Sequence, residues 1–400
     1  MQLVIADAFP ERFLADFLDL GLEVDYRPDV TAEDLGGVLE RANVLVVRSK
    51  KVSRKVIEGA KRLELVIRAG AGVDTIDVAA ASERGIYVAN CPGKNSIAVA
   101  ELAMGLIVAL DRRIVDATRD LAQGKWNKKE YSKAAGLKGR TLGIAGFGAI
   151  GRAVAKRALG FEMNVLAWSA ELTPEDAAAA GVAMASSLWE LAENSDFVSV
   201  HLPQTGETKG LFGEAFFARM KKGAAFVNTS RGGIHDTAAL AKAMREKGIR
   251  AGLDVYDPEP AGGVADFDHE ICKMPGFVGT HHIGASTDQA QNAIAAEAVR
   301  ICREFVRTGH VPHVVNIERH SPAKVQLIVR HYDKVGVLAA VLNVIRQYGL
   351  NVEEMSNTIF AGAKAAIATI RLADVPPPEL VSAIAALDEM VLHVETKSVG

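Results

Sequence analysis

Three short stretches in the second half of the sequence carry side chains that could act together on one substrate. They are NTSRGG (228–233) with Arg231, LDVYDPEP (253–260) with Asp254 and Glu259, and THHIGAST (280–287) with His281 and His282. Each stretch lies at the end of an expected strand, where ligands of open α/β sheets bind. A histidine can take a proton from a hydroxyl group, a carboxylate can orient it, and a guanidinium can hold a carboxylate or oxo group. The combination indicates oxidation of a 2-hydroxy acid.

The adjacent histidines are not equivalent candidates. The apolar run before them predicts a strand over 277–282, and neighbouring side chains of an extended chain point to opposite faces. We therefore expect only one of His281 and His282 to face a cleft. The residues alone leave open which one, or whether both are structural.

A glycine-rich turn predicts a dinucleotide site. TLGIA (141–145) reads as a strand, RAVAKRAL (152–159) as a helix, and between them lie Gly146, Gly148 and Gly151. This spacing permits a tight turn, close approach of a pyrophosphate, and binding at the helix N-terminus. The next strand ends in Ser169 rather than in an acidic residue, and no arginine lies beside it. We expect NAD as the cofactor, with NADP left open.

The elements that must position these residues form three segments. Residues 1–95 alternate short β-type runs with helical stretches, and a second such block follows the helix that begins at Ser96. This alternation predicts two Rossmann-like or flavodoxin-like lobes with parallel sheets. The segment 323–400 reads as βαββαβ, the order of a small ferredoxin-like domain. The predicted fold class is α/β.

Composition excludes several classes of protein. The net charge of −3 argues against a nucleic-acid-binding protein, and no uncharged apolar run is long enough to span a membrane. Three widely spaced cysteines and no visible export signal predict a soluble, cytoplasmic protein without disulfides. The set His269, Cys272 and His282 lacks compact ligand spacing, so we expect no metal site.

The three catalytic stretches resemble those of the D-isomer-specific 2-hydroxyacid dehydrogenase family. That family carries S-R-G-G, D-V-x-x-x-E-P and P-H-I-G segments, and His281 stands here in place of the proline. The resemblance implies that Arg231 holds the substrate, that His282 is the acid/base and that Glu259 assists it. It also implies that Asp254 binds the nicotinamide carboxamide, with further cofactor contacts from Ala149, Ile150, Leu202, Thr229, Ser230, Gly284 and Ala285.

The resemblance further implies the substrate and the division into lobes. Arg48 and Ser49 match the family's V-R-S segment, and RAGAGVD (68–74) matches a carboxylate cradle formed by Ala71 and Gly72. The expected reaction is oxidation of 3-phospho-D-glycerate to 3-phosphohydroxypyruvate, the first step of L-serine biosynthesis. Substrate would bind a lobe made of 1–95 and 284–318, and NAD a lobe made of 96–283. A homodimer or homotetramer is expected.

The C-terminal segment, 323–400, resembles an ACT domain, a small amino-acid-sensing module. In serine-sensing versions the effector loop reads H-x-N-x-P-G and is followed by an asparagine after one helix. The corresponding residues here are His331, Asp333 and Asn351, with Asp333 in place of the first asparagine. A serine effector and a purely structural or oligomerising role are both compatible with this pattern.

Two other functions fit the same residues. A glyoxylate or hydroxypyruvate reductase, using NAD or NADP, would need the same Arg, Glu and His. A nucleotide-sensing binding protein could also retain this fold without turnover.

Overall fold

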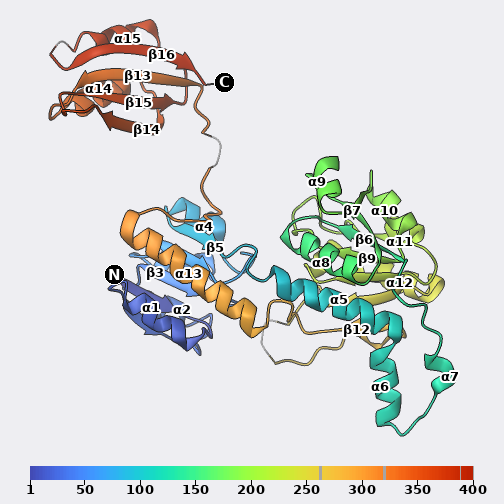
Figure 1. Ribbon diagram of the computed structural model, residues 1–400. Helices are drawn as coiled ribbons and strands as arrows, with labels where there is room; N and C mark the ends of the chain where they lie inside the picture. The colour runs from blue at the N-terminus through green and yellow to red at the C-terminus, as the bar shows by residue number, and fades with distance from the viewer. Residues whose placement is uncertain (261–263, 319–320, 388, 400) are drawn as a thin grey trace. The chain divides into compact units, whose positions relative to one another are not determined.

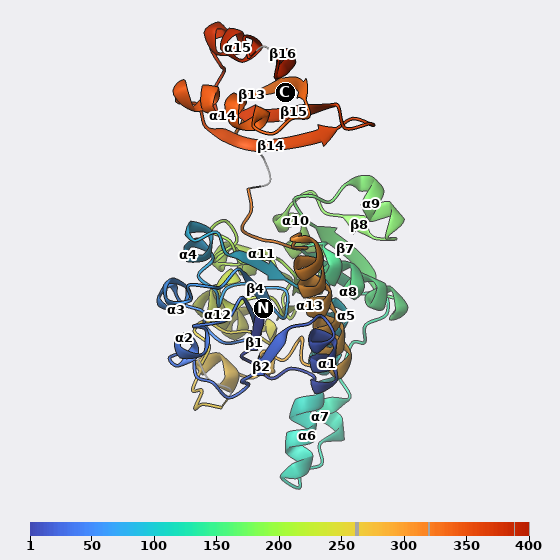
Figure 2. The ribbon, with the colours of Figure 1, turned by 90° about the vertical axis from the view of Figure 1, so that its left-hand side faces the viewer.

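The chain folds into two units, Met1–Asn316 and Ile317–Gly400. The structure is a computed structural model that describes residues 1–260, 264–318, 321–387 and 389–399. The first unit contains two parallel sheets and the second an antiparallel one (Figures 1 and 2). The expected α/β class, with two Rossmann-like sheets and a small ferredoxin-like domain, is confirmed.

The first sheet has the strand order β2-β1-β3-β4-β5, with every neighbour parallel. Its strands are β1 (Gln2–Ile5), β2 (Glu23–Tyr26), β3 (Val44–Val47), β4 (Leu65–Arg68) and β5 (Tyr87–Asn90). Alternate residues face opposite sides, so Leu3 and Ile5 belong to one core and Val4 to the other. Both faces are thus buried, which explains why these strands read as continuous apolar runs.

Helices cover both faces of this sheet. One face carries α2 (Leu35–Val38), α3 (Arg54–Gly59) and α4 (Val78–Glu83). The other carries α1 (Leu14–Leu18) and α13 (Asp288–Thr308) (Figure 1). The chain therefore returns to its first sheet through α13 after building the second.

The second sheet has the order β12-β11-β10-β9-β6-β7-β8 and is also parallel. Its strands are β6 (Thr141–Ala145), β7 (Asn164–Trp168), β8 (Ala183–Met184), β9 (Phe197–Val200), β10 (Ala225–Asn228), β11 (Arg250–Leu253) and β12 (Phe277–Gly279). The strand order reverses at β6, because β7 and β9 lie on opposite sides of it. A reversal of this kind opens a crevice for ligands at the strand ends.

The helices of this second block fall into two layers. One core contains side chains of α5 (Ser96–Arg112) and α8 (Ala149–Gly160), and the other those of α10 (Leu188–Asn194), α11 (Glu214–Arg219) and α12 (Thr237–Lys247). The short α9 (Pro174–Ala179) follows β7. After α5, the helices α6 (Ile114–Ala122) and α7 (Lys128–Tyr131) bury none of their residues and extend away from the sheet as an arm (Figures 1 and 2).

The second unit is a four-stranded antiparallel sheet of order β14-β15-β13-β16. Its elements are β13 (Val325–Tyr332), α14 (Val337–Gln347), β14 (Val352–Ile359), β15 (Ala365–Leu372), α15 (Pro378–Ala385) and β16 (Val391–Ser398). Val325, Leu327 and Val329 pack in one core with Val341 of α14 and Leu380 of α15, so both helices cover the same face.

Candidate active site

His282 and Glu259 form a hydrogen-bonded pair at the end of the second sheet. His282 Nδ1 lies 2.7 Å from Glu259 Oε2, and the Tyr256 amide donates to Glu259 Oε1 at 3.0 Å. Burial opposes ionisation of Glu259, but these hydrogen bonds and the charge of Arg231 outweigh it, so its pKa lies below the ordinary value. An ionised Glu259 accepts the proton of Nδ1, which leaves Nε2 of His282 free to accept a proton.

The backbone around His282 differs from the expected strand. β12 ends at Gly279, and His282 has a φ of 55°, in the left-handed region. The expected strand over 277–282 was therefore wrong in its last three residues, because the chain turns at His282. The turn is held by the buried Asp254, whose carboxylate accepts from Thr280 Oγ1 at 2.6 Å and from the amides of Ile283 and Gly284 at 2.9 Å. His281 is exposed.

The contacts of Asp254 bear on its expected role in binding the nicotinamide carboxamide. A carboxylate offers about four acceptor positions, and three donors of the loop already use this one. Gly284 packs so closely that a Cβ there would lie 3.0 Å from Asp254 Oδ2, while Ala285 is half-buried beside it. Asp254 shapes the loop that carries His282, whatever else it binds.

Arg231 meets the 70–74 loop that follows β4. Its Nε donates to Asp74 Oδ2 at 3.0 Å and its Nη2 lies 2.9 Å from the same oxygen, and a Cβ on Gly72 would lie 2.0 Å from Nη2. Only glycine at position 72 allows this approach. Within the described residues, the amides of Ala71 and Gly72 donate to no other protein group. Two free amides beside a guanidinium form a cradle for a carboxylate.

The turn that carries Arg231 is built by a buried amide. Asn228 Nδ2 donates to the Arg231 carbonyl at 2.8 Å, and Asn228 Oδ1 accepts from the Ser230 amide at 2.9 Å. His235 Nδ1 lies 3.1 Å from Asn228 Nδ2, and burial lowers the pKa of His235 to about 4. The neutral ring therefore accepts from Asn228 and fixes the amide that shapes this turn.

Arg68 is a site residue that the sequence reasoning missed. It ends β4, its Nε is buried without a partner among the described residues, and its guanidinium lies against Gly70. Burial, and then the charges of Arg231 and Arg48, lower its pKa, and Asp74 opposes this only in part. Its place at the end of β4 could have been predicted from the sequence, whereas its proximity to Arg48 and Arg231 could not.

Arg48 and Ser49 are held by Asp7, which the sequence reasoning also missed. The Asp7 carboxylate accepts from the amides of Arg48, Ser49 and Lys50 at 2.7, 3.0 and 3.1 Å, and from Ser49 Oγ at 3.0 Å. The Ser49 hydroxyl proton is thus already engaged. Arg48 Nη2 reaches Ser286 Oγ at 3.2 Å, which brings it to the loop after His282. Arg48 and Arg231 therefore both lie near enough to Arg68 for their charges to act on it, and the Asp74 carboxylate acts on it in the opposite sense.

The glycine turn has the shape that a dinucleotide requires. Gly146 has a φ of 98°, and a Cβ there would lie 2.6 Å from the His201 carbonyl oxygen. A Cβ on Gly151 would lie 2.1 Å from the Gly146 carbonyl oxygen, whereas Gly148 faces open space. The amides of Ala149 and Ile150, in the first turn of α8, donate to no protein group in the described chain.

Other polar groups near this turn fit a bound cofactor. Thr229 Oγ1 is buried without a hydrogen-bond partner among the described residues. Ser169 follows β7 directly, and one residue separates Leu202 from the end of β9. Both therefore lie at the strand ends that flank the glycine turn. Ser230 Oγ instead donates to the Val200 carbonyl at 2.8 Å. An unpaired hydroxyl and free helix amides are the donors that a pyrophosphate and a nicotinamide ribose would use.

The expected effector residues lie apart within one copy of the second unit. His331 Nδ1 lies 2.8 Å from the Tyr332 carbonyl oxygen and its Nε2 lies 3.0 Å from Asn357 Oδ1. Asp333 follows β13, whereas Asn351 accepts from the Ala373 amide, near the start of β13. An eight-residue strand is about 25 Å long. Asp333 and Asn351 thus cannot hold one amino acid in a single copy.

Two other kinds of feature are absent from the described ranges. None of the helices there is long and apolar enough to cross a membrane. In those same ranges, no three His, Cys, Asp or Glu residues are placed to hold a metal ion together.

Comparison with known proteins identifies relatives of most of the first unit. Residues 104–284 match the family described as "D-isomer specific 2-hydroxyacid dehydrogenase, NAD binding domain". A D-3-phosphoglycerate dehydrogenase of Methanocaldococcus jannaschii is 40% identical over 319 residues, which are 79% of this chain and 60% of that protein. A hydroxypyruvate reductase of Thermotoga maritima is 42% identical over 269 residues, 67% of this chain and 86% of that protein.

A solved structure agrees with these matches. The TT0316 protein of Thermus thermophilus has a TM-score of 0.70 and 34% sequence identity, and the match covers 79% of this chain and all of that one. The chain spans less than two thirds of the length of the phosphoglycerate dehydrogenase relative. The expectation of an NAD-binding domain is confirmed.

Proposed function

The chain belongs to the D-isomer-specific 2-hydroxyacid dehydrogenase family, and from that premise we propose that it oxidises 3-phospho-D-glycerate to 3-phosphohydroxypyruvate with NAD. The observation that carries the choice of substrate is the excess of positive charge around Arg68, where the charges of Arg231 and Arg48 are opposed by the carboxylate of Asp74, which already pairs with Arg231. 3-Phosphoglycerate brings both a carboxylate and a phosphate, and so offers a partner for each unpaired cation.

The substrate carboxylate would bind the cradle and Arg231. The free amides of Ala71 and Gly72 and the guanidinium of Arg231 are the donors available there. Because Asp74 holds Arg231 in the free site, substrate must displace or share that contact. The phosphate would then be held by Arg48 and Arg68, and burial of Arg68 strengthens its interaction with an anion.

Proton transfer falls to His282. Its Nε2 takes the proton of the 2-hydroxyl, and ionised Glu259 stabilises the imidazolium through Nδ1. Bound NAD would accept the hydride that leaves carbon 2, the substrate carbon that carries this hydroxyl. Gly146, Gly148, Ala149, Ile150, Gly151, Ser169, Leu202, Thr229, Ser230, Asp254, Gly284 and Ala285 are the residues that we propose hold it.

The lobes would divide the work. We assign substrate binding to 1–95 with 284–318, cofactor binding to 96–283 and regulation to the ACT domain, 323–400. A serine effector would need Asp333 of one copy and Asn351 of another, because one copy keeps them apart. This requirement supports a homodimer or homotetramer.

A reductase of hydroxypyruvate or glyoxylate is the second candidate function. A relative of that activity covers two thirds of this chain, and the neutral Ser169 would tolerate the 2′-phosphate of NADP. Neither substrate carries a phosphate, however, so both would leave Arg48 and Arg68 without an anionic partner. A nucleotide-sensing protein without turnover is a third candidate.

The test is a set of initial rates followed at 340 nm with the purified full chain. 3-Phosphoglycerate is offered with NAD or NADP, and hydroxypyruvate and glyoxylate with NADH or NADPH, each with and without serine. We expect the highest kcat/KM for 3-phosphoglycerate with NAD. Turnover of glyoxylate or hydroxypyruvate alone would establish the second candidate, and no turnover of any substrate would favour the third.

A further inference from the structure

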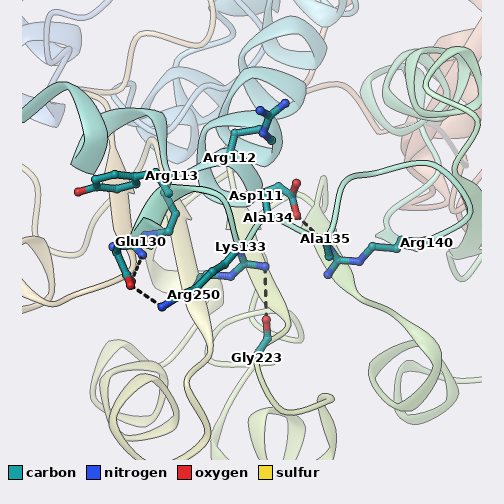
Figure 3. A pocket seen from close by; sticks show the side chains of 11 residues that line it. Asp111, Arg112, Arg113, Glu130, Lys133, Ala134, Ala135, Arg140, Gly223 and Arg250 are labelled. Atoms are coloured by element: carbon teal, nitrogen blue, oxygen red, sulfur yellow. Dashed lines mark hydrogen bonds and ion pairs between the residues drawn. The ribbon is translucent and has the colours of Figure 1, made fainter. Parts of the chain in front are cut away.

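A second cationic cavity lies at the root of the α6–α7 arm, and it has no part in the proposed reaction. Its volume is about 250 Å³. Its charged lining comprises five cations and two carboxylates: Arg112, Arg113, Lys133, Arg140, Arg250, Asp111 and Glu130 (Figure 3). The cations thus exceed the carboxylates by three. We call it the arm-root cavity.

Both carboxylates of the arm-root cavity already have partners. Asp111 is buried and accepts from Arg140 Nη1 at 2.8 Å and from the Gly136 amide at 3.1 Å. Glu130 accepts from Arg113 Nη1 at 2.6 Å and from Lys133 Nζ at 2.5 Å. Neither carboxylate is therefore available to the remaining cations.

Arg112 and Arg250 are the two lining cations without a carboxylate partner among the described residues, and Arg250 is the more buried of them. Its Nη1 donates to the Leu110 carbonyl at 2.8 Å and its Nη2 reaches the Gly223 carbonyl only at 3.4 Å. No Asp or Glu of the described residues pairs with it. Lys133 and Arg140 line the same cavity (Figure 3). Burial and the charges of Arg140 and Arg113 lower its pKa, with Asp111 opposing. A half-buried guanidinium among like charges is costly unless an anion joins it.

The backbone at the cavity is also in an uncommon conformation. Arg113 joins α5 to α6 with a φ of 51°, and its guanidinium lies 4.9 Å from the ring centroid of Tyr131. A left-handed arginine is disfavoured by about 1 kcal/mol or more. It turns the arm so that Glu130, Tyr131 and Lys133 close one side of the cavity. The cations come from the end of α5 (Arg112, Arg113), from the segment after α7 (Lys133), from the residue before β6 (Arg140) and from the start of β11 (Arg250).

We propose that the arm-root cavity binds a small oxyanion of the phosphate class, inorganic phosphate or a phosphate monoester. Guanidinium groups recognise such oxygens through paired hydrogen bonds. The cavity is of a size for a small anion, and its cations come from four separate places in the fold that the anion would tie together. Its occupant would join the end of α5 to the arm and to β11.

The test is calorimetric titration of inorganic phosphate into the full chain and four variants, at constant low ionic strength. Arg68→Gln removes one of the two cations proposed to hold the phosphate in the active site, so binding at the active site should weaken in this variant and binding at the arm-root cavity should not. Arg250→Gln and Lys133→Gln each remove one cation of the cavity. Arg119→Gln is the matched control, since its side chain is 63% exposed on α6 outside the cavity.

We expect phosphate binding that persists in Arg68→Gln and Arg119→Gln. It should weaken about tenfold in both cavity variants, the loss expected for one charge-assisted hydrogen bond. Lys133 is 65% exposed, so its variant tests the cavity even where Arg250→Gln fails to fold. Equal binding in the cavity variants and the Arg119 control would overturn the proposal. The absence of any phosphate binding that persists in Arg68→Gln would also overturn it. If phosphate does not bind the parent and the cavity variants change their oligomeric state, the cavity instead holds a carboxylate of a second copy, and the proposal is wrong.

Discussion

Arg68→Gln is expected to lower affinity for substrate and to raise stability at the same time. In the free protein the Arg68 guanidinium is largely buried, has no partner on Nε among the described residues, and lies near Arg48 and Arg231. Its lowered pKa means that the folded state disfavours its charge. Removing that charge should therefore stabilise the free protein, by about 1 kcal/mol for an unpaired polar group.

The effect on substrate has the opposite sign. A hydrogen bond between a guanidinium and an ionised phosphate contributes about 1.5–3 kcal/mol, which is about tenfold to a hundredfold in KM. Glyoxylate has no phosphate, so its KM should be almost unchanged. The exposed Arg62→Gln, in the same lobe, is the matched control and should change neither quantity.

One assay measures the change in stability and a second measures the change in affinity for substrate. Thermal unfolding without ligands should give a Tm raised by roughly 2–4 °C, and steady-state kinetics should give the KM values for 3-phosphoglycerate and for glyoxylate. A lower Tm would show that Arg68 is paired in the free protein. Equal losses for both substrates would show that Arg68 does not contact the phosphate, and the proposed substrate would lose its main support.

Three further predictions follow from the same geometry. His282→Ala should reduce kcat by about 10²- to 10⁴-fold with NAD binding kept, and normal turnover of that variant with loss in His281→Ala would reverse the assignment. Asp74→Asn removes the partly exposed ion pair that competes with substrate for Arg231, a pair that contributes about 0.2–1 kcal/mol. The KM for 3-phosphoglycerate should therefore fall, by up to about fivefold. A raised KM with a lower kcat would mean that Asp74 instead holds Arg231 in its productive position. The pKa of His235 is about 4 in the folded protein, against an ordinary value of 6.5. Between these two values, unfolding takes up a proton. The stability that neutral His235 contributes is therefore complete above pH 6.5 and is lost at about 1.4 kcal/mol per pH unit as the pH falls towards 4. Denaturant titrations at pH 7, 6 and 5 measure that slope, and a slope that is the same in His235→Leu would contradict it.

Local rules make much of the fold and the candidate residues predictable from the sequence. The glycine turn at 146–151 needs only neighbours along the chain, and parallel strands place their ends at one edge of the sheet. Strand ends and family motifs together therefore point to Arg231, Glu259 and His282, and Glu259 and His282 do form a pair. The βαββαβ order of the second unit is equally local.

What the sequence did not reveal depends on contacts between distant residues. Arg68 is one arginine among many until the fold brings Arg48 and Arg231 to it. Asp7 gains its role only because β1 lies beside β3, which lets one carboxylate accept three amides of the 48–50 segment. The turn at His282 depends on Asp254, which is distant in sequence and whose carboxylate accepts from the amides of Ile283 and Gly284.

The most direct test of the proposed reaction is to follow the hydrogen on the substrate carbon. Full chain is incubated with NAD and 3-phospho-D-glycerate that carries deuterium at carbon 2, and the nucleotide is analysed by mass spectrometry. The account predicts reduced NAD with one deuterium, formed by the parent and lost almost entirely in His282→Ala. Reduced NAD without deuterium, or none despite bound substrate, would contradict it.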